Sequence, residues 1–347
     1  MDYFLEEILS QPRVIRATLD RYLEDECLLR SVSRVMEQGR YQLILLTGMG
    51  SSYFALYSAC VYLNEHGLSA TMVEASELLH YYKGLISDRV LVVIASQSGE
   101  TVEVQKLLGE VGGRTLIMSL TNDAENYVAR NSGLPLFLYA GQESGPASKT
   151  HTATISVMLL LAMYLTSTMN KQRVERLYAA VEAMESFLER WREKIDAMFD
   201  FLGKVDCLSL LGRGPSVASA MAGALILKEA AKMRAEGMSA GQFRHGPLEA
   251  VSPDLAAIVF AMKGRTRDIN LRLAHDIAEF GGKVVIIGSD EGLQGERIFN
   301  LTLPLLDEFS SPLLEIVPIQ LLSWRIATEK GLRPGKFDKA KKVTLYE

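Results

Sequence analysis

The chain has 347 residues, of which 48% are hydrophobic and 23% charged, and its formal net charge is −5. A prior of about 150 residues per domain suggests two domains, and the composition is that of a globular protein. Because no basic excess exists to neutralise phosphate backbones, we expect no nucleic-acid or membrane partner. A small anion can still bind at a locally positive site.

Cysteine usage and apolar patterning point to a reducing compartment. Cys27, Cys60 and Cys207 form no metal-ligand spacing and no disulfide framework. The acidic start of the chain lacks the basic and apolar regions of a signal peptide. The longest apolar run, residues 155–165, is shorter than the ~20 residues that cross a bilayer and predicts a buried helix. We therefore expect a cytoplasmic protein.

The first half of the chain alternates helical and strand patterns. Residues 1–40 show helical periodicity, and a continuous apolar run at 42–47 then ends in Gly48-Met49-Gly50-Ser51-Ser52, as a buried parallel strand does. A helix follows at 53–67, with strands at 70–74, 90–95 and 115–119. This alternation predicts an α/β domain with a parallel sheet over residues 41–170.

The second half repeats this pattern. Residues 171–200 are charged and predict a connecting helix. The segment 208–216 then resembles 43–52, and Gly212 stands in it where Gly48 stands in the first copy. A helix starts at Val217, and strands follow at 256–261 and 283–288. The sequence therefore predicts a domain-scale duplication, with a second domain at 201–330 and a C-terminal tail or lid at 331–347.

Each half predicts an open, doubly wound, flavodoxin-like parallel sheet. Ligands of such sheets bind beyond the carboxyl ends of the strands, where the strand order reverses. The Gly-x-Gly at Gly48 is not a dinucleotide fingerprint, because Tyr53 replaces the third glycine and Val217 does so in the second copy. No triphosphate-binding Gly-x-x-x-x-Gly-Lys-Ser/Thr motif occurs.

The strongest local motif follows the strand at 90–95, where the sequence reads Ser96-Gln97-Ser98-Gly99-Glu100-Thr101. Three hydroxyls, an amide and a glycine before a helix predict a phosphate site, because free N–H groups and the helix dipole favour an anion there. Ser52 can reach the same crevice. The alternative is simple helix capping by Ser98 or Thr101, for which one hydroxyl suffices.

The sequence resembles sugar-isomerase (SIS) domains, and above all the isomerase half of the glutamine–fructose-6-phosphate amidotransferase family. The shared motifs occur in the family's order: Glu7-Ile8-Leu9-Ser10-Gln11-Pro12, Gly50-Ser51-Ser52-Tyr53, Ser96-Gln97-Ser98-Gly99-Glu100-Thr101, Ala147-Ser148-Lys149-Thr150, Gly212-Arg213-Gly214, Leu227-Lys228-Glu229, His245-Gly246-Pro247-Leu248 and Ala340-Lys341-Lys342-Val343-Thr344.

This resemblance implies roles for particular residues. Phosphate binding is implied for Ser52, Ser96, Gln97, Ser98 and Thr101. Glu229 matches the general base that moves a proton between C1 and C2, His245 the ring-opening histidine supplied by a neighbouring subunit, and Lys341 a lysine that contacts the open-chain sugar. Pro146, Ser148 and Ala340 match positions at the sugar. The resemblance thus implies a sugar-phosphate ligand, a homodimer and no cofactor.

Two departures from the family matter. The glutaminase half has no counterpart in this sequence, so we expect no hydrolysis of glutamine. Ile226 stands where the family has a lysine three residues before the catalytic glutamate. The loop at 146–150 is also one residue shorter.

Without the resemblance, each catalytic candidate has an ordinary explanation. Glu229 could belong to a surface Lys-Glu pair, His245 could be structural, and Lys341 could lie in a solvated lysine run. The other histidines show no ligand spacing, so we expect no metal, although His151 follows the loop at 148–150 and could lie near the site.

Three hypotheses follow. The first is a glucosamine-6-phosphate deaminase that isomerises an aminohexose 6-phosphate and releases ammonia to give fructose 6-phosphate. The second is a deglycase or an aldose–ketose isomerase for another sugar phosphate. The third is a non-catalytic sugar-phosphate sensor, which would not need Glu229, His245 and Lys341 together.

Overall fold

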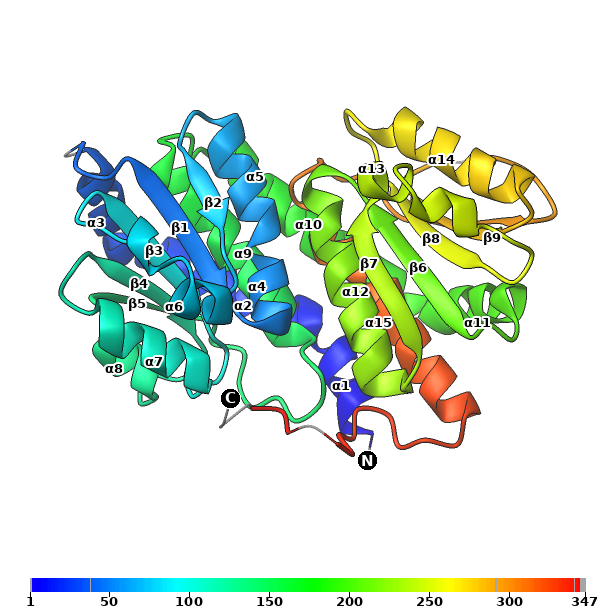
Figure 1. The fold of residues 1–347 in the computed structure, drawn as a ribbon, viewed down its shortest axis with the longest axis horizontal. Helices are drawn as coiled ribbons and strands as arrows, with labels where there is room; N and C mark the ends of the chain where they lie inside the picture. Colours follow the sequence, from blue (N-terminus) through cyan, green and yellow to red (C-terminus); the bar gives the residue numbers. More distant parts are fainter. Residues whose placement is uncertain (1, 38, 291, 340, 344–347) are drawn as a thin grey trace. The chain divides into compact units, whose positions relative to one another are not determined.

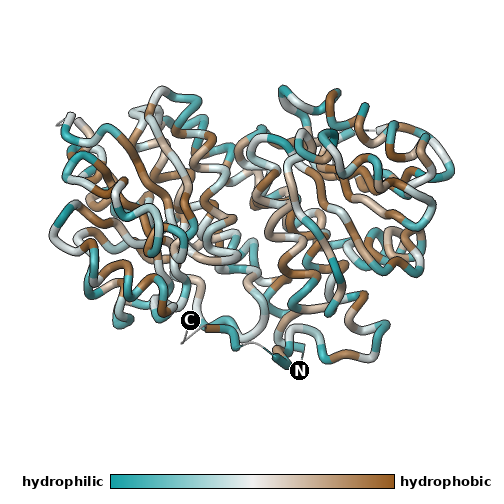
Figure 2. The backbone as a smooth tube through the Cα atoms, in the orientation of Figure 1, coloured by the Kyte–Doolittle hydropathy of each residue, from teal (hydrophilic) through white to brown (hydrophobic). Residues whose placement is uncertain are grey.

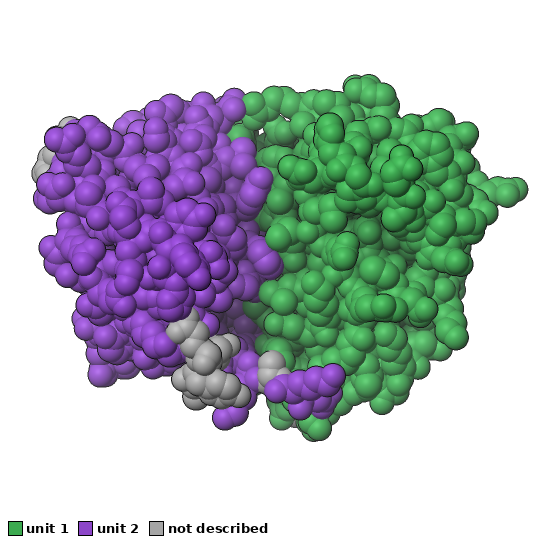
Figure 3. All heavy atoms as spheres, viewed as in Figure 1, with its two compact units in different colours: residues 1–12, 144–148, 175–337 green, residues 13–143, 149–174, 338–347 purple. Residues whose placement is uncertain are grey.

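The computed structural model of the protein describes residues 2–37, 39–290, 292–339 and 341–343. Strands and helices alternate along the chain and form two five-stranded parallel sheets (Figure 1). The chain divides into a first-sheet unit (residues 13–143, 149–174 and 338–347) and a second-sheet unit (residues 1–12, 144–148 and 175–337), coloured separately in Figure 3. Among the described residues, no helix is long and apolar enough to span a membrane.

Each unit is made of three separate stretches of the chain. The N-terminal segment Met1–Pro12 and the short segment Ser144–Ser148 belong with the second sheet, whereas the end of the chain belongs with the first. The sequence-based boundaries at 41–170 and 201–330 stay predictions.

The chain begins with three helices: α1 (Tyr3–Leu9), α2 (Gln11–Glu24) and α3 (Cys27–Glu37). Asp2 caps α1 by accepting a hydrogen bond from the Leu5 amide at 3.2 Å. Within the first-sheet unit, α2 is held to the chain after β5 (Leu134–Phe137), because the Thr18 hydroxyl donates to the Leu138 carbonyl at 2.7 Å. These three helices fall within the helical segment predicted at 1–40, whose bounds stay a prediction.

The first sheet has the strand order β2-β1-β3-β4-β5. Its other strands are β1 (Leu43–Gly48), β2 (Ala70–Met72), β3 (Val90–Ala95) and β4 (Ile117–Thr121), and the helices of the unit are α4 (Gly50–Ala55), α5 (Tyr57–Glu65), α6 (Ala75–His80), η1 (Lys83–Leu85), α7 (Val102–Val111), α8 (Tyr127–Asn131) and α9 (Lys149–Leu165). The central strands carry the hydrophobic residues, as the brown segments of Figure 2 show.

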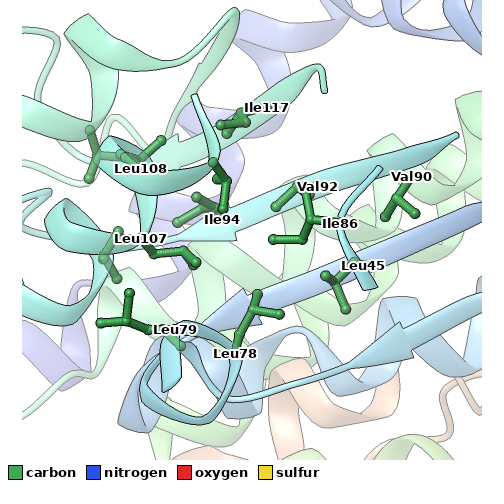
Figure 4. Packing of buried hydrophobic residues seen from close by; sticks show 14 residues of the cluster. Leu45, Leu78, Leu79, Ile86, Val90, Val92, Ile94, Leu107, Leu108 and Ile117 are labelled. Atoms are coloured by element: carbon green, nitrogen blue, oxygen red, sulfur yellow. The ribbon is translucent and has the colours of Figure 1, made fainter. Parts of the chain in front are cut away.

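The core of this unit lies where α6 and α7 cover one face of the sheet. Figure 4 shows Leu78 and Leu79 of α6 and Leu107 of α7 packed toward Val92 and Ile94 of β3. Every residue of β3 is buried, since the strand has neighbours on both sides. Its uninterrupted apolar sequence follows from that position. The predicted buried helix at 155–165 lies within α9, whose residues are buried from Thr150 onward.

The second sheet has the order β10-β9-β8-β6-β7, the same doubly wound topology. Its elements are α10 (Lys171–Glu189), α11 (Trp191–Leu202), β6 (Cys207–Gly212), η2 (Gly214–Ser216), α12 (Val217–Ala231), β7 (Arg234–Ser239), α13 (Ala240–Phe243), η3 (Pro247–Ala250), β8 (Ala256–Ala261), α14 (Arg267–Glu279), β9 (Lys283–Gly288), β10 (Ile298–Thr302) and α15 (Ser311–Glu329). The predicted fold class, two tandem doubly wound parallel sheets, is confirmed. The predicted connecting helix is two helices, α10 and α11.

Candidate active site

The strand order of the first sheet reverses between β1 and β3. The chain passes from β1 to β2 on one side and then to β3 on the other, so the carboxyl ends of β1 and β3 form a crevice. Gly48 pairs with Ala95 at these ends. A Cβ on Gly48 would lie 2.6 Å from the Ala95 carbonyl oxygen, so this close approach requires glycine.

The phosphate loop (residues 96–101) leaves β3 at this crevice and leads into α7. The Ser96 hydroxyl accepts a hydrogen bond from the Gly99 amide at 3.2 Å and lies 3.5 Å from the Thr101 hydroxyl. The Ser98 hydroxyl accepts from the Glu100 amide at 3.2 Å. These contacts curl the loop so that its hydroxyls and the first amides of the helix gather at one helix N-terminus.

Capping does not account for Thr101. It occupies the N-cap position of the ten-residue helix α7, yet its side chain makes no capping hydrogen bond. The N-terminal amides of α7 therefore keep the hydrogen-bonding capacity that an anion uses. Gln97, Ser98 and Thr101 are half-buried, which leaves the loop partly accessible to a ligand.

The end of the neighbouring strand β4 and the residue after it hold the phosphate loop through hydrogen bonds. The Gln97 carbonyl accepts from the Asn122 amide at 3.1 Å and from the Thr121 hydroxyl at 3.3 Å. Asn126 caps α8 by accepting from the Ala129 amide at 2.9 Å and donates to Thr121 at 2.6 Å. The loop is thus a preorganised part of the sheet edge.

Ser52 lies in α4, which begins directly after β1 and so at the same crevice as the phosphate loop. Its neighbour Ser51 is held by His151 of α9, whose Nδ1 lies 2.9 Å from the Ser51 hydroxyl and 3.2 Å from the Ser51 carbonyl oxygen. A carbonyl only accepts, so this contact places the proton on Nδ1. Burial lowers the pKa of His151 to about 4, so the ring is neutral near pH 7.

The second sheet has the corresponding crevice between β6 and β8. Ser216 is the counterpart of Ser52 in the duplication, and its hydroxyl donates to the carboxylate of Glu315 at 2.8 Å. Ser219 donates to the other carboxylate oxygen at 2.9 Å. Glu315 is 0% exposed, and burial raises its pKa to about 7. A carboxylate therefore engages the serine that corresponds to Ser52, which is a predicted phosphate-binding residue of the first copy.

The proton-transfer candidates belong to the second-sheet unit. Glu229 lies in the last turn of α12 and is half-buried, and Ile226, about one turn earlier, is only 3% exposed. His245 is exposed and follows α13, and its amide donates to the Gln242 carbonyl at 2.9 Å.

Pro146 and Ser148 lie buried in the segment Ser144–Ser148 of the same unit. Glu7 of α1 holds this segment, because its carboxylate accepts from the Ser144 amide at 2.6 Å and the Gly145 amide at 3.2 Å. Sequence reasoning assigned no role to Glu7, although it lies within a motif shared with the family.

Lys341 is exposed and belongs to the first-sheet unit, whereas Ala340 lies outside the described residues. The structure thus sorts the predicted site residues into two sets. The predicted phosphate-binding residues and Lys341 belong to the first-sheet unit, whereas Glu229, His245, Pro146 and Ser148 belong to the second-sheet unit. In the described part of the chain, no group of three His, Cys, Asp or Glu side chains could hold a metal ion.

Comparison with known proteins identifies both halves of the chain as SIS domains. The SIS domain family model matches residues 42–164 and 202–323, more than half of the chain. Glutamine–fructose-6-phosphate aminotransferase (isomerizing) of Methanothermobacter thermautotrophicus is 30% identical over 342 residues, which are 96% of this chain and 56% of that protein. The Thermococcus kodakarensis protein of the same name is 29% identical and is covered to 58%. The chain spans a little over half the length of these relatives.

Solved structures share the fold over nearly the whole chain. The C-terminal domain of glucosamine-fructose-6-phosphate aminotransferase from Francisella tularensis superposes with a TM-score of 0.86 at 24% identity, covering 98% of each chain. Glucosamine-6-phosphate deaminase from Thermotoga maritima gives 0.79 at 20% identity, covering 99% of each. Tagatose-6-phosphate ketose/aldose isomerase from Escherichia coli gives 0.84 at 17% identity, covering 97% of this chain and 95% of that one.

Proposed function

The chain belongs to the SIS domain family, and from this we propose that it is a sugar-phosphate enzyme, namely a glucosamine-6-phosphate deaminase. It would isomerise the amino sugar and release ammonia to give fructose 6-phosphate. The observation that carries the proposal is the phosphate loop, whose hydroxyls gather at the N-terminus of α7 in the crevice between β1 and β3. This arrangement suits a phosphate monoester.

The phosphate group positions the substrate. Ser96, Ser98 and Thr101 would donate their hydroxyls to the phosphate oxygens, with Gln97 and Ser52 completing the cradle. Neutral donors bind a dianion without bringing a formal positive charge into the crevice, and the helix dipole of α7 adds to the attraction. Binding energy at this remote group then orients the reacting carbons.

The reaction itself needs one proton shuttle and one hydrolysis. His245 would assist ring opening by proton transfer, for which an exposed histidine is suited. The Glu229 carboxylate would take the proton from C2 and return it to C1, which converts the open-chain 2-amino aldose into the imine of the 2-ketose. Water then adds to C2 and ammonia leaves, giving fructose 6-phosphate. Lys341 would contact the open-chain sugar.

One observation supports deamination over the aminotransferase reaction named for the relatives. Ile226 replaces the family's lysine on α12 with a buried apolar side chain, so the nitrogen chemistry served by that lysine has no equivalent group at this position.

An aldose–ketose isomerase is the second candidate. The tagatose-6-phosphate isomerase from Escherichia coli has a TM-score of 0.84 with this chain, slightly above that of the deaminase. The same shuttle by Glu229 would then act on a sugar with a hydroxyl at C2, and no hydrolysis would follow.

The deciding experiment is ammonia release by purified protein from glucosamine 6-phosphate, repeated with Glu229→Gln. We expect release by the wild type and a loss of about 10²-fold or more in the variant, which keeps the shape of the side chain but removes the base. Release by neither protein, with isomerisation of a neutral sugar phosphate by the wild type, would replace the deaminase with the isomerase. Binding without any turnover would favour the sensor.

A further inference from the structure

A buried carboxylate lies just before α9 and plays no part in the chemistry above. The Glu143 side chain is 0% exposed. Both of its oxygens accept hydrogen bonds from Thr150 in the first turn of α9: the amide donates to Oε1 at 3.1 Å and the hydroxyl to Oε2 at 2.6 Å. Glu143 therefore binds the N-terminus of a long buried helix, where a negative charge is favourable.

The charge of Glu143 also meets a cation from the far end of the chain. Lys342 Nζ lies 3.0 Å from Oε2 and donates to the main-chain carbonyl of Glu143 at 2.6 Å. The two residues are 199 positions apart in sequence but belong to the same first-sheet unit. Two bonds from one ammonium to one residue make a specific attachment. Removing the Lys342 cation would leave the Glu143 charge buried without it, which strongly lowers the stability of the folded protein.

The tail is therefore not a uniform run of solvated lysines. Lys339 and Lys341 are exposed, whereas the Lys342 side chain is only 23% exposed and points into the ion pair. Since Lys341 is the residue directly before Lys342, attaching one side chain restricts the position of the other.

We propose that Glu143 is a positioning residue that fixes the C-terminal tail through Lys342 and so holds Lys341 in place for the bound sugar phosphate. The role of Lys341 rests on the proposed function, but the attachment of the tail does not. The two parts are therefore tested by separate readouts.

The first readout is removal of the tail by carboxypeptidase from folded protein. Lys342→Met keeps most of the side-chain volume and removes the charge, and we expect its tail to be digested about 10-fold faster or more, because the attachment is lost. Lys342→Arg should restore most of the protection. Lys339→Met is the matched control, an exposed lysine in the same tail, and should digest like the wild type. Equal digestion of Lys342→Met and wild type would overturn the proposal.

The second readout separates positioning from folding. With glucosamine 6-phosphate, Lys342→Met should lower kcat by about 10-fold to 100-fold, as misplacement of a reacting group does. The melting temperature should fall, because Lys342→Met leaves the Glu143 carboxylate buried without its cation, so kcat is measured at a temperature at which circular dichroism shows both proteins fully folded. Lys339→Met should keep full activity. A released tail with unchanged kcat and KM would overturn the positioning role. A wild type that releases no ammonia would remove the proposed function, while the digestion result would still decide the attachment.

Discussion

Gly99 is the residue on which the shape of the phosphate loop depends most. Its φ of +65° lies in the left-handed region, and a Cβ there would meet the Asn126 side chain at 2.1 Å. Asn126 cannot withdraw easily, since it caps α8 and binds Thr121. Both the backbone conformation and the space therefore require glycine.

We expect Gly99→Ala to lower the free energy of unfolding by about 2 kcal/mol and to weaken binding of inorganic phosphate, because the loop must shift. Thermal shift with and without phosphate measures both effects. Gly109→Ala in the last turn of α7 is the control, since a Cβ there has nothing within 4 Å, and should stabilise by up to about 1 kcal/mol. A Gly99→Ala protein that binds phosphate normally would exclude the loop as the phosphate site.

His151 and Glu315 occupy corresponding positions in the two copies, since the offset between them equals the offset between Gly48 and Gly212. Each is buried in the last helix of its sheet and bonds a serine in the segment after the first strand. Burial raises the pKa of Glu315 from 4.5 to about 7 and lowers that of His151 from 6.5 to about 4. Their effects on stability therefore have opposite signs.

For Glu315, the unfolded chain loses its proton near pH 4.5 and the folded chain only near pH 7. The raised pKa of Glu315 contributes to the free energy of unfolding, and this contribution is complete below pH 4.5. It is lost as the pH rises to about 7, which lowers the free energy of unfolding by roughly 3 kcal/mol. Glu315→Gln removes this loss, so its free energy of unfolding relative to wild type should rise over that interval. Urea unfolding at several pH values measures it. A constant difference between the two proteins would mean that Glu315 titrates normally.

For His151, the unfolded chain binds a proton near pH 6.5 and the folded chain only near pH 4. The stabilisation is complete above pH 6.5 and is lost as the pH falls to about 4, again by roughly 3 kcal/mol. The free energy of unfolding of His151→Asn, relative to that of the wild type, should therefore rise as the pH falls. Between about pH 4.5 and 6.5 the effects of His151 and Glu315 on the free energy of unfolding have opposite signs. The free energy of unfolding of the wild type should therefore vary less with pH in this interval than that of either variant.

At the scale of elements, α12 lies so close to β7 that one position between them must be glycine. A Cβ on Gly237 of β7 would lie 2.3 Å from the Ala220 carbonyl oxygen of α12. Both partners are backbone, so the helix itself would have to move.

We expect Gly237→Ala to destabilise the protein by about 2 kcal/mol and to reduce ammonia release, because α12 carries Glu229. Urea unfolding and the activity assay test this. Gly295→Ala in the same unit is the control, since the nearest atom is a flexible Ile298 side chain at 3.5 Å. If both variants unfold like the wild type, the approach of α12 to β7 is looser than described.

The strands that sequence reasoning missed are all edge strands. β3, β8 and β9 have the predicted bounds, whereas β5, β7 and β10 were not predicted. An edge strand pairs on one side only and is less buried, so it needs no apolar run: β7 reads Arg-Ala-Glu-Gly-Met-Ser. The predicted helix at 53–67 is split into α4 and α5.

At the scale of the whole molecule, the proposed homodimer makes a prediction of its own. If His245 serves the site of the neighbouring subunit, co-expression of Glu229→Gln with His245→Asn should restore activity. Each mixed dimer with twofold symmetry then contains one intact site, so about a quarter of wild-type activity is expected from random pairing.

Each variant alone should be nearly inactive, and a chain carrying both changes, co-expressed with either single variant, should restore nothing. Ammonia release by the purified mixture is the measurement. Mixtures no more active than the single variants would show that His245 acts within its own subunit or not at all.

The sequence alone determined the two sheets, their duplication and the phosphate loop. These features leave patterns within about ten neighbouring residues, such as the buried run of β3 followed by Ser96 to Thr101, because a central strand and the helix start after it depend on local sequence. The resemblance to SIS domains supplied Glu229, His245 and Lys341, which spacing alone would have left as ordinary surface residues.

Only the tertiary structure decided which side chains the buried carboxyl groups of Glu143 and Glu315 contact. Glu143 binds Lys342 across 199 positions, and Glu315 binds Ser216 across 99. In sequence, Glu143 is one acidic residue in a loop, and Glu315 is one of several polar residues in a largely apolar helix. Ion pairs and buried hydrogen bonds depend on which segments the fold brings together, so residues so far apart along the chain leave no local pattern from which their contact could be predicted.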